Sequence, residues 1–150
     1  MTIAFKVSSG EVNRRTFRNI KQMPHQMRRG ITRALHEAGK EMRDDSVKAI
    51  RAKGKTGIVY KIRGRRHQSS ARGEAPARLT GELIKSIDWL VLKGSLGLIY
   101  GAGDTPKASK YARRLEVTLN RPYLKPAVRK VQKTLPTKVE NKIKQLISQI

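Results

Sequence analysis

The sequence predicts an α+β domain in which a small antiparallel sheet is packed by two long helices. Apolar and polar residues alternate over several short stretches, and this period of two is typical of half-buried strands. Within 24–52 and 128–150, apolar residues instead recur at helical spacing. With 150 residues and no cysteine, the chain is expected to form one domain, 1–150, that is held together by its apolar core.

The N-terminal third is predicted to contain a strand and a long helix. Alternation over 3–7 predicts the strand, which Gly10 ends, and apolar residues within 12–20 predict a short helical stretch. Pro24 suits the first turn of a helix that extends to about Ala52. The apolar positions of this long helix are Met27, Ile31, Leu35, Ala38, Met42 and Ile50.

Segment 51–78 is the most basic part of the chain, with nine basic residues against the single acid Glu74. It shows little periodicity and holds glycine and serine residues that are typical of turns. We interpret it as a long loop or an extended hairpin.

A second group of short elements follows. Thr80 is the expected N-cap of a short helix that carries Leu83, Ile84 and Ile87. Alternating residues from Trp89 to Tyr100, interrupted by a Gly-Ser turn at 94–95, predict a two-stranded hairpin.

The last part of the chain is predicted to be helical. A short helix is expected over 109–117, followed by a turn between Pro122 and Pro126. The final helix has Pro136 as a point where it can kink. Its apolar face consists of Val128, Val131, Leu135, Val139, Ile143, Leu146, Ile147 and Ile150.

The charge points to a polyanionic partner. The chain has 34 Lys and Arg against 11 Asp and Glu, a net charge of +23, far more than solubility requires. The stretch 79–109 is neutral and rich in apolar residues, so we expect a core sheet with basic elements around it. No apolar run approaches the roughly 18 residues that span a bilayer, and we expect a soluble protein without a membrane partner.

Residues that could support catalysis or bind metal are few. The three histidines lie in separate segments and lack the spacing of a metal site: His25, His36 and His67. Glu41, Asp44 and Asp45 cluster on the long helix and could hold a divalent ion, as a nuclease requires. We favour a salt-bridged helix face, because Lys40, Arg43 and Lys48 are close in sequence. We therefore expect no enzyme activity, cofactor or metal.

The basic segment predicts contact with nucleic-acid phosphates. Six of its cations are assigned to this role: Lys55, Lys61, Arg63, Arg65, Arg66 and Arg72. Tyr60 is its only aromatic residue, and no helix-turn-helix or zinc-finger spacing occurs, so binding is expected to be independent of base sequence. A non-specific nucleic-acid-binding protein of ribosomal or nucleoid type is therefore one candidate.

Four blocks in order resemble the tail-completion and head-tail joining family of tailed bacteriophages. They are Ser-x-x-Gly-Glu-x-Pro-Ala at 70–77, Thr-Gly-x-Leu-x-x-Ser-Ile at 80–87, Tyr-Ala-x-x-Leu-Glu at 111–116 and Arg-Pro-Tyr-Leu-x-Pro-Ala at 121–127. One departure is that Glu116 precedes Val-Thr-Leu, where relatives often have an aromatic residue and Gly-Thr. Singly, such residues can also serve as caps: Thr80 and Gly81 at a helix start, and Tyr123 and Leu124 beneath the final helix.

The resemblance implies a small α+β virion protein of the neck, which is assembled in the host cytoplasm. It implies a homo-oligomeric ring around the DNA channel, six-fold in preference to twelve-fold. Its neighbours would be connector or stopper proteins, tail-terminator or tail-tube proteins, and double-stranded DNA. The subunit or neck-partner interface would include Tyr60, Pro76, Tyr111, Arg121, Pro122 and Tyr123.

Overall fold

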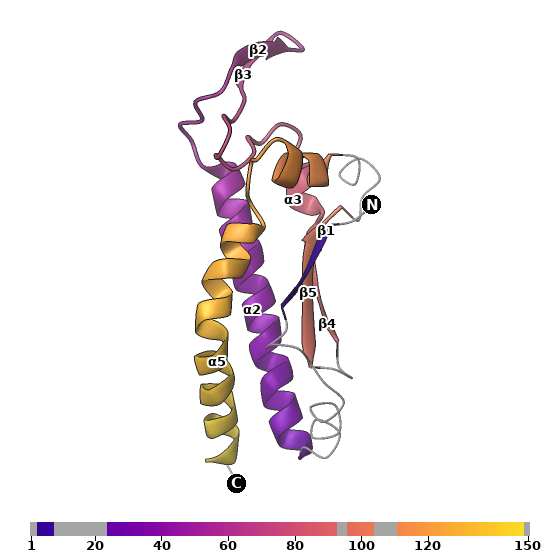
Figure 1. The fold of residues 1–150 in the computed structure, drawn as a ribbon, viewed down its shortest axis with the longest axis vertical. Helices are drawn as coiled ribbons and strands as arrows, with labels where there is room; N and C mark the ends of the chain where they lie inside the picture. Colours follow the sequence, from indigo (N-terminus) through magenta and orange to yellow (C-terminus); the bar gives the residue numbers. More distant parts are fainter. Residues whose placement is uncertain (1–2, 8–23, 93–95, 104–110, 149–150) are drawn as a thin grey trace.

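The computed structural model describes residues 3–7, 24–92, 96–103 and 111–148. It confirms the α+β class: a three-stranded antiparallel sheet packs against two long helices, and a separate two-stranded hairpin lies at one end (Figure 1). The helical stretch expected within 12–20, the turn at 94–95 and the first residues of the helix expected over 109–117 lie outside the described residues.

The sheet has the strand order β1-β5-β4, with every neighbouring pair antiparallel. Its strands are β1 (Ile3–Val7), β4 (Ile87–Leu92) and β5 (Gly97–Ala102). Alternation predicts the central strand well, because Leu98, Tyr100 and Ala102 are all buried. The edge strand β4 begins at Ile87, which the sequence assigned to the preceding helix; its side chain is buried as the first inward residue of the strand.

The two long helices are α2 (His25–Arg51) and α5 (Lys125–Ile147). They run side by side, and α2 also contacts β4 and β5 while α5 reaches β1 (Figure 1). Pro24 is the N-cap of α2 and Ala52 its C-cap, so the predicted length is confirmed. Helix α5 begins at Lys125 and continues through Pro136, which is exposed. No helix within the described ranges is both long and apolar enough to cross a membrane.

Two short helical segments precede α5. Helix α3 (Glu82–Lys85) starts after Gly81, which takes the N-cap position at φ 87°. The prediction of Thr80 as N-cap is therefore wrong by one residue, although its hydroxyl accepts a long hydrogen bond from the Glu82 amide (3.4 Å). The π-helical turn η1 (Arg114–Thr118) overlaps the C-terminal part of the helix expected over 109–117 and extends one residue beyond it.

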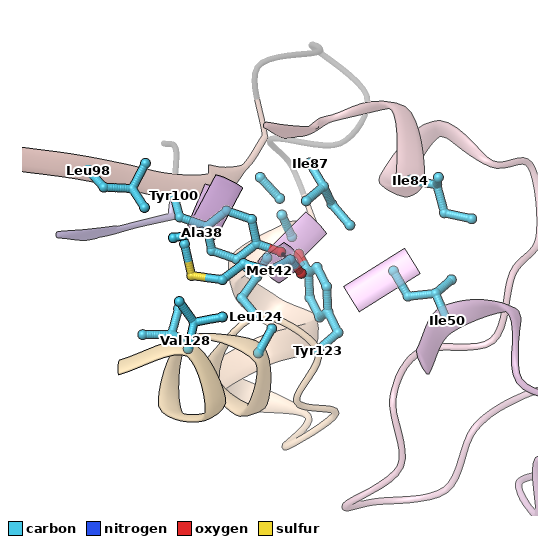
Figure 2. Close-up of a cluster of buried hydrophobic side chains, with 14 of the residues drawn as sticks. Ala38, Met42, Ile50, Ile84, Ile87, Leu98, Tyr100, Tyr123, Leu124 and Val128 are labelled. Carbon is cyan, nitrogen blue, oxygen red and sulfur yellow. Dashed lines mark hydrogen bonds between the residues drawn. The ribbon is translucent and has the colours of Figure 1, made fainter. Parts of the chain in front are cut away.

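A buried polar chain connects the sheet to both long helices. The Tyr100 hydroxyl on β5 lies within hydrogen-bond distance of two acceptors on α2, the Met42 carbonyl (2.8 Å) and the Ser46 hydroxyl (2.7 Å), and can donate its proton to either. Ser46 in turn donates to the carbonyl of Tyr123, just before α5. Figure 2 shows the rings of Tyr100 and Tyr123 close to Met42 within the apolar cluster. Burial raises the pKa of both tyrosines above the ordinary value.

Tyr123, which the sequence assigned to a partner interface, is a core residue. Its side chain is only 1% exposed, and its buried hydroxyl has no hydrogen-bond partner among the described residues. The alternative interpretation of the Arg-Pro-Tyr-Leu block, in which Tyr123 and Leu124 pack beneath the final helix, agrees with this burial. Pro76 is likewise buried, so neither side chain is part of the exposed surface.

We expect Tyr123→Phe to leave the free energy of unfolding unchanged or to raise it by up to about 1 kcal/mol, because a buried, unpaired hydroxyl is removed. The matched change Tyr100→Phe should lower it by about 1 kcal/mol, since the one hydrogen bond that this hydroxyl donates, to the Met42 carbonyl or to Ser46, is lost. Urea unfolding followed by circular dichroism measures both. A larger loss for Tyr123→Phe than for Tyr100→Phe would contradict this assignment.

Candidate nucleic-acid and partner interface

The basic segment forms a hairpin that projects beyond the C-terminal end of α2 (Figure 1). Its strands are β2 (Val59–Ile62) and β3 (Arg65–Gln68). Arg63 and Gly64 form the two-residue turn, with φ of 49° and 76°. Positive φ at both positions is what a tight hairpin turn requires, and glycine adopts it without strain.

The register distributes positive charge over both faces of this hairpin. Lys61 lies opposite Arg66, while Ile62 lies opposite Arg65. Because directly opposed side chains share a face, Lys61 and Arg66 occupy one face and Arg65 the other, with Arg63 at the tip. All four side chains are exposed, and none forms an ion pair with a carboxylate in the described part of the chain.

The positive charges of Lys61 and Arg66 repel each other across the hairpin. An anionic ligand would relieve this repulsion, so the charge of the hairpin suits such a ligand.

Apolar side chains on the hairpin are also exposed. Ile58 is 79% exposed, Val59 44% and Tyr60 42%. The ring of Tyr60 stands edge-on to His67, with centroids 5.3 Å apart and an interplanar angle of 70°. The stability of a two-stranded hairpin with uncovered apolar residues is marginal in water. We therefore expect a partner protein to cover these residues.

Glu74 anchors the base of the hairpin. Its carboxylate accepts hydrogen bonds from the Thr56 amide (3.1 Å), the Thr56 hydroxyl (2.7 Å) and the Ala71 amide (2.9 Å). The Thr56 hydroxyl and then the two amides hold the pKa of this carboxyl below its ordinary value. The two ends of the segment are thereby tied together.

This pKa shift predicts a pH-dependent contribution to stability. Because the folded-state pKa of Glu74 is lowered, its contribution is present above the unfolded value of 4.5 and is lost as pH falls through the folded value. The thermal midpoint of the native protein should therefore exceed that of Glu74→Gln at pH 6, and the difference should shrink toward pH 3. A difference that grows on acidification would contradict the assignment.

Glu116 organises the other blocks. Its buried carboxylate accepts hydrogen bonds from the backbone amides of Tyr123 (2.8 Å), Leu124 (3.2 Å) and Lys125 (2.9 Å), at the start of α5. The Gly73 amide donates to the Asn120 carbonyl (2.6 Å), which joins the 70–77 block to the same turn. Blocks that are separated in the sequence thus meet at the end of the molecule from which the hairpin projects.

A cleft of about 690 Å³ lies between this unit and the hairpin. Its lining includes five residues that the sequence assigned to partner or phosphate contact: Tyr60, Arg63, Pro76, Tyr111 and Arg121. Arg78, which the sequence placed in the basic segment, also lines the cleft, and sequence reasoning missed two further lining residues, Leu79 and Arg114. No local pattern placed Leu79 and Arg114 near Arg78.

The remaining predicted residues lie elsewhere. Lys55 donates to the carbonyl of Ala49 (3.0 Å) and is half-buried, so it caps the end of α2 and is less available for phosphate than predicted. Arg72 is exposed near the base of the hairpin. Pro122 is half-buried and outside the cleft lining.

Two residues of the acidic cluster on α2, Glu41 and Asp45, pair with lysines of α5. Glu41 pairs with Lys138 and, at 3.9 Å, with Lys130, which also binds Asp45 at 2.8 Å. A salt-bridged face was expected, but the predicted partners within α2 are wrong; Arg43, for example, donates instead to the Ile87 carbonyl (3.1 Å). In the part of the chain that the structure covers, no three His, Asp or Glu side chains are placed to hold a metal ion.

Comparison of the chain with protein-family models, curated proteins and solved structures finds no match. The functional argument therefore depends on the geometry and on the four sequence blocks.

Proposed function

We propose that the chain is a structural protein of the neck of a tailed phage, one subunit of a ring that joins head to tail around the DNA. One observation carries the proposal: all four blocks that resemble this family contribute residues to one cleft at the base of a projecting cationic hairpin, and three of them are joined by hydrogen bonds. Glu116 holds the start of α5, and Gly73 binds Asn120. Such mutual dependence supports treating the blocks as one module and not as four chance matches.

The distribution of exposed apolar residues supports ring formation. A closed ring needs two different contact surfaces on each subunit, because an interface of one surface with itself stops at a dimer. Ile58 on the hairpin is 79% exposed, and Leu90 on the outer side of β4 is 59% exposed. These residues lie on separate elements and offer two distinct surfaces.

The exposed hairpin cations favour a second candidate from another class, a non-specific nucleic-acid-binding protein of the host. Both candidates predict binding to DNA, and they differ in the particle that contains the protein. A neck protein is present in virions as a closed ring, whereas a ribosomal or nucleoid protein fractionates with host ribosomes or chromosomal DNA.

Loss of the gene from its phage tests the proposal. If the protein joins a filled head to a finished tail, lysates of the deletion should contain DNA-filled heads and free tails of normal length. Electron microscopy of the lysates gives this result directly. Joined particles without the protein would refute the assignment, and empty heads or overlong tails would place the protein in packaging or tail-length control instead.

Complementation with variants sharpens the test. Ile58→Asp places a charge on the exposed hairpin surface and should reproduce the unjoined phenotype without disturbing the core. Lys133→Glu on the exposed side of α5 is the matched control, because it also changes charge at the surface, and it should restore joining.

A further inference from the structure

We propose that the cleft between the hairpin and η1 binds an acidic peptide segment of a partner protein, with one apolar side chain inserted as an anchor. The proposal goes beyond the neck assignment, because it specifies the chemistry of a partner and does not require a ring or a virion. It is carried by the cleft's charge, its apolar walls and its shape.

The charge of the cleft is one-sided. Four arginines contribute to its lining, namely Arg63, Arg78, Arg114 and Arg121, and among the described residues that line it Glu82 is the only acid. Glu82 is itself paired with Lys85 at 3.5 Å. Guanidinium groups bind carboxylates through two parallel hydrogen bonds, so several arginines around one cleft suit a segment with several carboxylates.

The walls of the cleft are apolar. Leu79 is 52% exposed there, although leucine is normally buried, and Leu83, Leu115 and Leu119 also contribute to the lining. A volume of about 690 Å³ lies within the range of sites that enclose a compact ligand or anchor. A peptide with an apolar side chain between carboxylates would cover Leu79 with the apolar side chain. Its carboxylates would then lie beside the arginines.

Nucleic acid fits this cleft less well than a peptide. A duplex can take a projecting two-stranded hairpin into its major groove, but its rod of phosphates does not enter an apolar cleft. Tyr60 and His67 both line the cleft, but their rings are edge-to-face at 70°, so they do not form a continuous stacking platform for bases. A second copy of this chain would not supply such a segment, because its longest run of acidic residues is the pair Asp44 and Asp45.

The test is fluorescence anisotropy of the full chain with labelled peptides at 0.15 M salt. One peptide carries a central leucine between two runs of three glutamates, and its control has serine in place of leucine. We expect the leucine peptide to bind at least about tenfold more tightly, since burial of one leucine supplies that factor.

Matched variants locate the binding. Arg78→Gln with Arg114→Gln should weaken binding of the leucine peptide at least about tenfold, because two charge-assisted contacts are lost. Arg65→Gln with Arg66→Gln removes the same charge from the hairpin and should change it less than about threefold. All four side chains are exposed, and thermal melting checks that each variant folds.

Two results would overturn the proposal. Equal binding of the leucine and serine peptides, or an equal loss in both double variants, would show general attraction to a basic protein. Displacement of the peptide by single-stranded oligothymidylate, with oligothymidylate binding lost in the cleft variant alone, would assign the cleft to nucleic acid instead.

Discussion

A chain in which Lys61, Arg63, Arg65 and Arg66 are all changed to glutamine is expected to bind duplex DNA about a thousandfold more weakly at 0.15 M salt. Each cation that neutralises a phosphate releases counterions and contributes about 0.9 to the slope of log affinity against log salt. Four such contacts would contribute about 3.6 to that slope. All four side chains are exposed on one hairpin, and a two-stranded hairpin in the major groove can bring cations on both of its faces to the phosphates of the two strands.

Fluorescence anisotropy with two unrelated duplexes, between 50 and 200 mM salt, measures both the affinity and the slope. The control removes the same charge from exposed positions on the long helices: Lys40, Lys48, Arg129 and Lys133, each changed to glutamine. If the control loses as much affinity as the hairpin variant, the net charge of the chain and not the hairpin governs binding. A strong preference for one duplex would refute sequence-independent contact.

The second large effect concerns stability. Glu116→Ala should lower the free energy of unfolding by about 3–5 kcal/mol, because three backbone amides at the start of α5 lose their acceptor and each buried, unpaired donor costs about 1–3 kcal/mol. Domains of this size are stable by only about 5–15 kcal/mol, so the variant would be near its folding limit. The midpoint of urea unfolding reports the change.

Two further variants serve as controls for Glu116→Ala. Glu116→Gln keeps an acceptor oxygen and should lose distinctly less stability than Glu116→Ala. Glu140→Ala removes an exposed carboxylate whose one ion pair within the described residues is with Lys144 on its own helix, and its unfolding midpoint should match that of the unchanged chain. If Glu116→Ala unfolds at the same urea concentration as Glu140→Ala, the carboxylate does not hold the start of α5.

Local patterns predict the elements of this fold but not the contacts between them. Alternation identified β5, and helical spacing identified α2, because each pattern reflects one buried face. The beginning of β4 was missed because Ile87 suits a helix or a strand equally, and only its pairing with Ala102 decides. The acidic cluster on α2 was paired with the wrong partners for the same reason: its lysines come from α5.

The candidate site was likewise predictable in part from the sequence. Net charge identified the cations of the hairpin, since an excess of positive residues is visible without any structure. Burial was not visible: Tyr123 is an aromatic residue in a turn, and only the packing of α5 over it shows that it belongs to the core. The cleft joins residues from the hairpin to Arg121, a combination that no local sequence window contains.

The position of α2 also bears on how the protein is made. Its last residue, Arg51, leaves the ribosome well before β5 and α5, which cover its apolar side at 97–102 and 125–147. At about 5–20 residues per second, roughly 5 to 20 s pass between the end of α2 and the end of α5. During that interval Met42 and its apolar neighbours remain uncovered, so the core closes only when translation is nearly finished. A nonsense mutation before α5 would therefore produce an aggregating fragment and not a smaller working protein.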